Sequence, residues 1–220
     1  MKEKFKDLTI EEKEEKFNGL INYANKIKNK SLRNVCINIL NDFKEELSCR
    51  GAGHDGIEKF KYSRTHQCFD GGLLDHLLNV TKISYNIALT YEKDVDIDLI
   101  LFGAILHDLG KIKIFDKYDK DNEIHSNLNY NYLLVDHVYI GEKIVEEYLS
   151  KEDISDKLKY QALHIIATHM DTLDKHMAEA YIVSYADEID AYIENIISYP
   201  RNSINPLFNT YFYESDNSDK

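Results

Sequence analysis

Residues 106–111 read Leu106-His107-Asp108-Leu109-Gly110-Lys111 and directly follow a run, residues 99–105, that contains no polar side chain. A helix that is apolar on every side is normally buried, so this run predicts a buried helix. That helix would carry an imidazole and a carboxylate into the interior, where an unpaired ionised carboxylate is very costly. A bound metal ion would neutralise it. The alternative, from these residues alone, is a helix end at which Asp108 caps a backbone amide and His107 fills a pocket.

The composition favours a single helical domain. The chain has 220 residues, of which only 2 are Pro and 9 are Gly, and this length is ample for a buried core. So few helix-breaking residues favour long helices over a strand-and-turn architecture, and we predict an all-α fold. The formal net charge of -12 at pH 7 argues against a broad electrostatic contact with nucleic acid, because that contact needs a basic surface. Bound divalent metal ions would offset part of this charge.

The cysteines and the N-terminal sequence predict a cytoplasmic protein. The 3 cysteines show no zinc-ligand spacing, and their odd number gives no disulfide framework. Residues 1–7 lead into a charged segment without the apolar core of a signal peptide, and no apolar run approaches the length needed to cross a bilayer. We therefore expect no membrane contact.

Hydrophobic periodicity predicts helices along most of the chain. Thr9 followed by Glu12 has the spacing of a capping box, and Ser31 is predicted to begin the next helix, so residues 8–49 indicate a helical hairpin. Gly110 is predicted to end the buried helix of the opening run. The buried helix begins near residue 96. The other predicted helices cover residues 73–91, 137–149 and 178–198, and one more begins after residue 155.

Irregular segments interrupt or follow these helices. Residues 49–72 contain several glycines and a locally basic run with Arg64 and His66, which is either a phosphate contact or an ordinary exposed loop. Residues 116–131 are rich in Asp, Asn and Tyr and indicate a loop or lid. The acidic residues 214–220 are typical of a disordered tail.

Helical spacing separates the inward polar side chains from the outward ones. His76 lies on the apolar face of its helix, and His169 continues the buried stripe of another helix. His164 lies on the flank of that stripe, where it either supports a site or is purely structural. Asp187 interrupts an apolar helix. Asp190 and Glu194, which lie within helical reach of Asp187, are interpreted as a wet acidic edge.

Histidines and aspartates at inward positions recur on five predicted helices. Each of these residues has a structural explanation by itself. Burying several ionisable groups that have no common partner would, however, destabilise the core. Imidazole and carboxylate together suit Mn, Fe, Co, Ni or Zn, and the absence of thiolates argues against a purely structural zinc. We therefore predict a metal site. Its candidate ligands are His76, His107, Asp108, His137, His169 and Asp187.

The order and setting of these residues resemble the HD-domain superfamily of metal-dependent phosphohydrolases. The resemblance covers about residues 60–200 and implies an all-α HD-domain helical bundle with the N-terminal hairpin packed on it. It rests on the phrases GGLLDH at residues 71–76, LHDLGK at 106–111, DHVYIG at 136–141, IATH at 166–169 and SYAD at 184–187. The predicted division is a hairpin over residues 1–50, an HD domain over 51–200 and a C-terminal extension over 201–220.

The resemblance implies two divalent metal ions bridged by Asp108. In such a site a bridging water becomes hydroxide near neutral pH and attacks phosphorus. Mn, Fe, Co or Ni are expected rather than Zn or Mg. One metal would be held by His76, His107 and Asp187, and the other by His137 and His169.

The same resemblance implies residues that act on the substrate. Lys111 is expected to neutralise a nonbridging phosphate oxygen as a point charge, which gives it a catalytic role beside Asp108. His66, Arg64 and Lys111 are expected to contact the substrate phosphate. The implied function is hydrolysis of a phosphate ester, a monoester or a diester, of a nucleotide or short oligonucleotide.

Within the superfamily the chain is similar to YhaM-type 3′-to-5′ exoribonucleases, which makes RNA an alternative substrate. The sequence departs from that family at residues 169–171, His-Met-Asp, where a second histidine is usual, and a helical hairpin stands in place of an N-terminal OB-type module. Together with the net charge, these departures favour a small phosphorylated substrate over RNA. Two other readings remain open, a di-iron oxygenase built from the same ligands and a noncatalytic signalling module. A homodimer is also left open.

Overall fold

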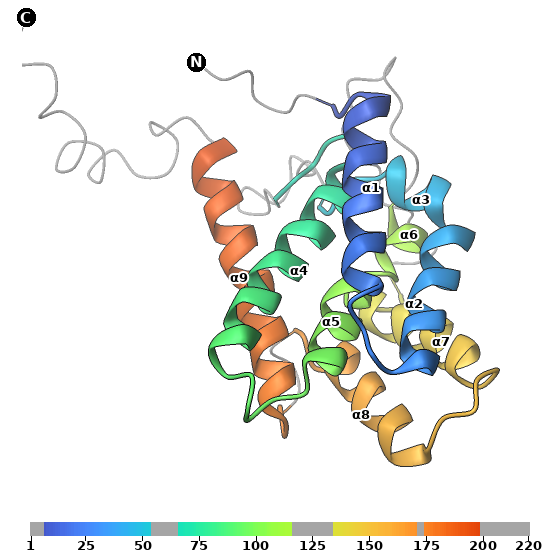
Figure 1. Ribbon diagram of the computed structural model, residues 1–220. Helices are drawn as coiled ribbons and strands as arrows, with labels where there is room; N and C mark the ends of the chain where they lie inside the picture. The colour runs from blue at the N-terminus through green and yellow to red at the C-terminus, as the bar shows by residue number, and fades with distance from the viewer. Residues whose placement is uncertain (1–6, 54–65, 116–133, 171–173, 199–220) are drawn as a thin grey trace, which may run out of the picture.

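The computed structural model describes residues 7–53, 66–115, 134–170 and 174–198, and within these ranges it contains nine α-helices and no strand (Figure 1). This confirms the predicted all-α fold. Three predicted features lie outside the described residues: Arg64, the loop or lid at residues 116–131, and the C-terminal extension. No helix within the described ranges is long and apolar enough to cross a bilayer.

The first helix, α1 (Ile10–Ala24), begins at the predicted capping box. Thr9 Oγ1 accepts a hydrogen bond from the Glu12 backbone N–H at 3.2 Å, and Glu12 Oε2 accepts one from the Thr9 N–H at 2.7 Å. These bonds satisfy two N–H groups that every helix start otherwise leaves unpaired. Leu20 on the inner face is fully buried.

The second helix, α2 (Lys30–Asp42), begins slightly before the predicted residue. Asn29 caps it by accepting from the Leu32 N–H, whereas Ser31 lies inside the first turn and donates to the Asp153 carbonyl. Asn and Ser are equally favourable N-cap residues, so the sequence pattern alone did not show whether Asn29 or Ser31 caps α2. A short helix, α3 (Lys44–Ser48), completes the predicted hairpin.

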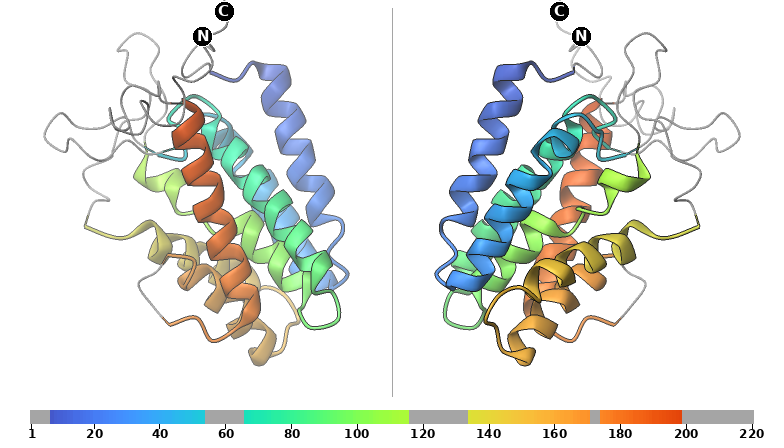
Figure 2. Two further views of the ribbon diagram at one scale, coloured as in Figure 1. Left: turned by 90° about the vertical axis from the view of Figure 1, so that its left-hand side faces the viewer. Right: turned by 90° about the vertical axis from the view of Figure 1, so that its right-hand side faces the viewer.

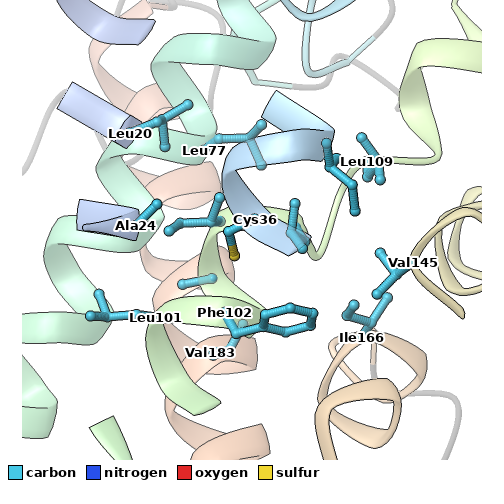
Figure 3. Packing of buried hydrophobic residues seen from close by; sticks show 14 of the residues in the cluster. Leu20, Ala24, Cys36, Leu77, Leu101, Phe102, Leu109, Val145, Ile166 and Val183 are labelled. Atoms are coloured by element: carbon cyan, nitrogen blue, oxygen red, sulfur yellow. The ribbon is translucent and has the colours of Figure 1, made fainter. Parts of the chain in front are cut away.

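The long helix α4 (Gly72–Thr90) and the helix α5 (Ile97–Leu106) form the centre of the bundle (Figure 1). Every residue of α5 from Leu99 to Leu106 is buried, as predicted. Figure 3 shows Phe102 of α5 among side chains that other helices contribute. The buried helix of the opening run is therefore the core element of the fold.

The remaining helices are α6 (Lys111–Ile114), α7 (His137–Leu149), α8 (Asp156–Ala167) and α9 (Ala178–Ser198). The bounds of α7 and α9 are the predicted ones, and Ser155 caps α8 by accepting from the Leu158 N–H. Helix α9 runs beside α4 (Figure 2). Helix α8 packs against both α5 and α7.

Gly110 does not end α5, contrary to prediction. Helix α5 ends at Leu106, and Gly110 precedes α6 with φ of -61°, a conformation open to any residue. The glycine is needed for space instead. A Cβ atom there would lie 1.9 Å from the His137 carbonyl oxygen at the start of α7.

The hairpin shares one buried hydrophobic cluster with the rest of the bundle. Helix α1 packs on α4, and α2 packs on α5 and α7. Cys36 of α2 is fully buried, and burial raises the pKa of its thiol well above the usual value. The division of the chain near residue 50 stays a prediction.

Candidate metal centre

The structure brings all six predicted ligands together at the centre of the bundle. Helix α4 supplies His76, the turn after α5 supplies His107 and Asp108, and the start of α7 supplies His137. The residue after α8 and the middle of α9 supply His169 and Asp187. Five of the six are buried, and His137 is partly exposed.

Four side chains form the first group, namely His76, His107, Asp108 and Asp187, whose ligand atoms lie within 4.8 Å of one another. His76 Nε2 lies 3.2 Å from Asp108 Oδ2 and 3.1 Å from Asp187 Oδ1. The Nε2 atoms of His76 and His107 are 3.3 Å apart. A metal at this position would have two imidazoles and two carboxylates in reach.

A second group contains Asp108, His137 and His169. Asp108 Oδ1 lies 3.3 Å from His137 Nε2 and 3.5 Å from His169 Nε2. Asp108 therefore belongs to both groups, because its Oδ2 faces the first group and its Oδ1 faces the second. One carboxylate in this position suits a bridge between two cations.

The partners of the histidine Nδ1 atoms show that the opposite nitrogen is free to bind a metal. His107 Nδ1 lies 3.0 Å from the Ala104 carbonyl oxygen, and His169 Nδ1 lies 2.7 Å from the Ile166 carbonyl oxygen. A carbonyl can only accept, so each Nδ1 carries the hydrogen and each Nε2 presents a lone pair to the cluster.

Several buried acceptors at the centre have no hydrogen-bond partner in the described part of the chain. They include Asp108 Oδ1, His137 Nε2 and His169 Nε2. Buried polar atoms are normally paired, and an array of converging lone pairs and carboxylates is repulsive without a positive charge. The donor set therefore fits a divalent cation.

The ionisation of the cluster also follows from its charges. Burial opposes ionisation of Asp108, but Lys111 and the nearby histidines hold the pKa of its carboxyl well below the usual value. Burial alone would lower the pKa of His76, but hydrogen bonds to carboxylates, those of Asp108 and Asp187 foremost, raise it well above 6.5. For His107 burial prevails and lowers the pKa to about 4.

Two predicted substrate-binding residues lie at the cluster. Lys111 Nζ is 2.5 Å from Asp108 Oδ2, and its side chain is largely buried. The ring centroid of His66 lies 4.4 Å from that of His76, and His66 Nε2 is buried without a hydrogen-bond partner in the described chain. Burial, then the charges of His76 and Lys111, lower the pKa of His66 to about 2.

His164 lies apart from the six residues in its described contacts. Its Nε2 accepts from the His176 backbone N–H at 3.1 Å, and the two rings stack with centroids 5.7 Å apart. These contacts agree with a structural role for His164, and they do not include any of the six candidate ligands.

Two residues at the centre were missed or misread in the sequence. Asp190 is 5% exposed, so its assignment to a wet acidic edge is wrong. Its Oδ2 accepts from His76 Nδ1 at 2.7 Å and from Gln67 Nε2 at 2.8 Å. The spacing of Asp187 and Asp190, three apart on one helix, was the available signal for Asp190. No pattern in the sequence marked Gln67.

Comparison with known proteins decides the family. The sequence pattern of the HD domain matches residues 73–192, which is more than half of the chain. The chain belongs to the HD-domain family. This HD-domain protein is 30% identical over 189 residues to dihydroneopterin 2′,3′-cyclic phosphate phosphodiesterase of Methanocaldococcus jannaschii, an alignment that covers 80% of this chain and 70% of that protein. No solved structure matches it significantly.

A second relative is the 3′-5′ exoribonuclease YhaM of Bacillus licheniformis. The HD-domain protein is 22% identical to it over 187 residues, which cover 82% of this chain and 55% of YhaM. The chain thus spans about half the length of that exoribonuclease. Both comparisons agree with the predicted superfamily, and the chain is a metal-dependent phosphohydrolase.

Proposed function

We propose that the HD-domain protein hydrolyses a phosphoester of a small nucleotide-like molecule at a centre of two divalent metals that share Asp108. One observation carries this proposal: the two oxygens of Asp108 face two separate groups of ligand atoms. The first metal would be held by His76, His107 and Asp187 and the second by His137 and His169.

Two bound divalent metals would lower the pKa of a water molecule and stabilise the attacking and leaving oxygens. The protein holds the ligands ready, because the buried Nδ1–H groups of His107 and His169 are fixed on backbone carbonyls. Mn, Fe, Co or Ni are the proposed metals, because imidazole and carboxylate ligands suit them, and the imidazole ligands disfavour Mg, which prefers oxygen.

Lys111 and His66 are proposed to bind the substrate in different ways. Lys111 places a positive charge beside Asp108, where it neutralises a nonbridging phosphate oxygen. His66 stays neutral at neutral pH, because its pKa is lowered to about 2, so it acts as a hydrogen-bonding group and not as a cation. Its unpartnered Nε2 atom supports this contact.

Lys111→Met is expected to lower kcat/KM about 10- to 100-fold, because a charge-assisted hydrogen bond is worth about 1.5–3 kcal/mol. Metal content measured on the same preparations should stay at the wild-type level. Lys143→Met is the control, since Lys143 pairs with Glu146 on the exposed face of α7. Unchanged kcat/KM in Lys111→Met would remove the proposed role, and loss of metal would assign Lys111 to holding Asp108 instead.

The favoured substrate class is a small phosphodiester. The relative from Methanocaldococcus jannaschii is named for a cyclic phosphate of a pterin, and the net charge of -12 disfavours an extended nucleic-acid contact. Trimming of RNA from the 3′ end is the second candidate, which the similarity to YhaM supports at a lower identity.

A substrate screen tests the proposal. Protein loaded separately with Mn²⁺, Co²⁺, Ni²⁺ or Fe²⁺ is assayed on 2′,3′-cyclic nucleotides, mononucleotides, cyclic dinucleotides and 5′-labelled RNA. We expect hydrolysis of a small phosphodiester that a chelator abolishes and added metal restores. Stepwise shortening of the RNA would favour the exoribonuclease. Absence of hydrolysis with every metal, together with oxygen uptake by the iron form, would overturn the proposal in favour of an oxygenase.

A further inference from the structure

Asp190 and Gln67 join His76 in a buried chain of hydrogen bonds that ends at the metal centre. Asp190 Oδ2 accepts from His76 Nδ1 at 2.7 Å and from Gln67 Nε2 at 2.8 Å. We propose that Asp190 and Gln67 are positioning residues that fix His76 and thereby set the affinity of the metal position made by His76, His107 and Asp187. This inference rests on the proposed metal centre and assigns Asp190 and Gln67 no contact with metal or substrate.

The partner of His76 differs from those of the other ligand histidines. His107 and His169 bond to carbonyls three residues earlier in their own backbone, so local structure holds them. His137 Nδ1 lies 2.9 Å from Asp136 Oδ1, and the Asp136 side chain is 62% exposed. Water therefore competes for this hydrogen bond. Only His76 has its Nδ1 on a buried carboxylate, among the ligand histidines that the structure describes.

A buried carboxylate has two effects on an imidazole. An ionised carboxylate can only accept, so Asp190 holds a hydrogen on His76 Nδ1. Nε2, which faces Asp108 and Asp187, is then the nitrogen that a metal would bind in place of its proton. The negative charge of Asp190 also makes Nε2 a stronger ligand. The bond joins α4 to α9, which run side by side (Figure 2), so the ring orientation depends on tertiary packing and not on α4 alone.

Gln67 is held in an unusual backbone conformation beside Asp190. Its φ is 44°, in the left-handed region that non-glycine residues rarely adopt. Its carbonyl oxygen accepts from the Ala52 and Phe69 N–H groups, and a Cβ atom at Gly72 would lie 2.0 Å from that oxygen. The surroundings therefore impose this conformation, as is common at functional sites.

The amide of Gln67 has only one possible orientation. A flipped amide would place its Oε1 against the Asp190 carboxylate, where two acceptors repel. In the orientation present, Oε1 is buried and has no hydrogen-bond partner in the described chain. An unsatisfied buried acceptor is destabilising, so stability alone does not explain this arrangement. A role in fixing Asp190 does.

Metal binding measured on Asp190 variants tests the inference. Metal-free protein is titrated with Mn²⁺ or Co²⁺ alone, in competition with a chromophoric chelator. We expect Asp190→Ala to weaken one binding step about 10- to 100-fold, the range typical of lost partners of metal ligands, and to leave the other step unchanged. Asp190→Asn keeps the volume and one acceptor and should give a smaller loss. Gln67→Met should weaken the same step.

Asp42→Asn is the matched control, because Asp42 also accepts a side-chain hydrogen bond, from Tyr148 at 2.7 Å, but at an exposed position. It should bind both metals as the wild type does. His137→Ala identifies the step that belongs to the other metal position. Melting temperatures of all variants show whether a loss of metal reflects unfolding.

Wild-type affinity at both steps in Asp190→Asn and Asp190→Ala overturns the inference, and so does an equal loss at both steps. These outcomes are separable from the proposed function. If Asp190 and Gln67 affect metal affinity as proposed but the protein hydrolyses no phosphoester, only the proposed function is overturned. If the wild type binds one metal only, the affinity for that metal in the variants decides the inference. A wild type that binds none overturns both.

Discussion

Asp108→Asn will abolish phosphoester hydrolysis and weaken binding at both proposed metal positions by more than about 100-fold. Even the loss of a residue that only hydrogen-bonds to a metal ligand costs about 10- to 100-fold. Asparagine keeps the shape of the side chain but removes the charge that faces both ligand groups. Titration of the metal-free variant with Mn²⁺ and a turnover assay measure the two effects.

The control for this substitution is Asp75→Asn. Asp75 also lies next to a ligand histidine in the sequence, but its carboxylate pairs with Lys16 of α1 and not with the cluster. It should keep wild-type turnover and metal content. If Asp108→Asn retained turnover on the substrates that the wild type cleaves, Asp108 would not be the shared ligand.

Gly110→Ala will destabilise the fold and disrupt the proposed metal position that contains His137. The new Cβ atom would lie 1.9 Å from the His137 carbonyl oxygen and 2.8 Å from the Gly141 nitrogen. Both are backbone atoms, so α7 must move away from Asp108. Overpacking of this kind costs about 1–3 kcal/mol, measured as a lower denaturant midpoint, and the metal content should fall by one ion per chain.

Gly19→Ala provides the comparison for this prediction. A Cβ atom at Gly19 meets only the flexible end of the Leu78 side chain, at 3.0 Å, so the cost should be much smaller. An unchanged midpoint and unchanged metal content in Gly110→Ala would show that α7 tolerates the displacement without loss of His137.

Local sequence was sufficient for the long helices of this fold, but not for the end of α5 or for the short helix α6. The bounds of α7 and α9 followed from apolar periodicity, because this pattern depends only on neighbours within one or two turns of the same helix. The inward position of His76 followed in the same way, since its neighbours Leu73 and Val80 lie on the same buried face. The resemblance to the HD-domain superfamily then grouped the six ligands.

The sequence by itself determined which long helices form, which faces they bury and which motifs they carry. Only the tertiary structure decided that Asp190 meets His76, that Gln67 meets Asp190, and that Gly110 makes room for the backbone of α7. The physical reason is that periodicity records the direction of a side chain relative to its own helix. It does not record which residue of another helix, 114 positions away for His76 and Asp190, packs opposite to it.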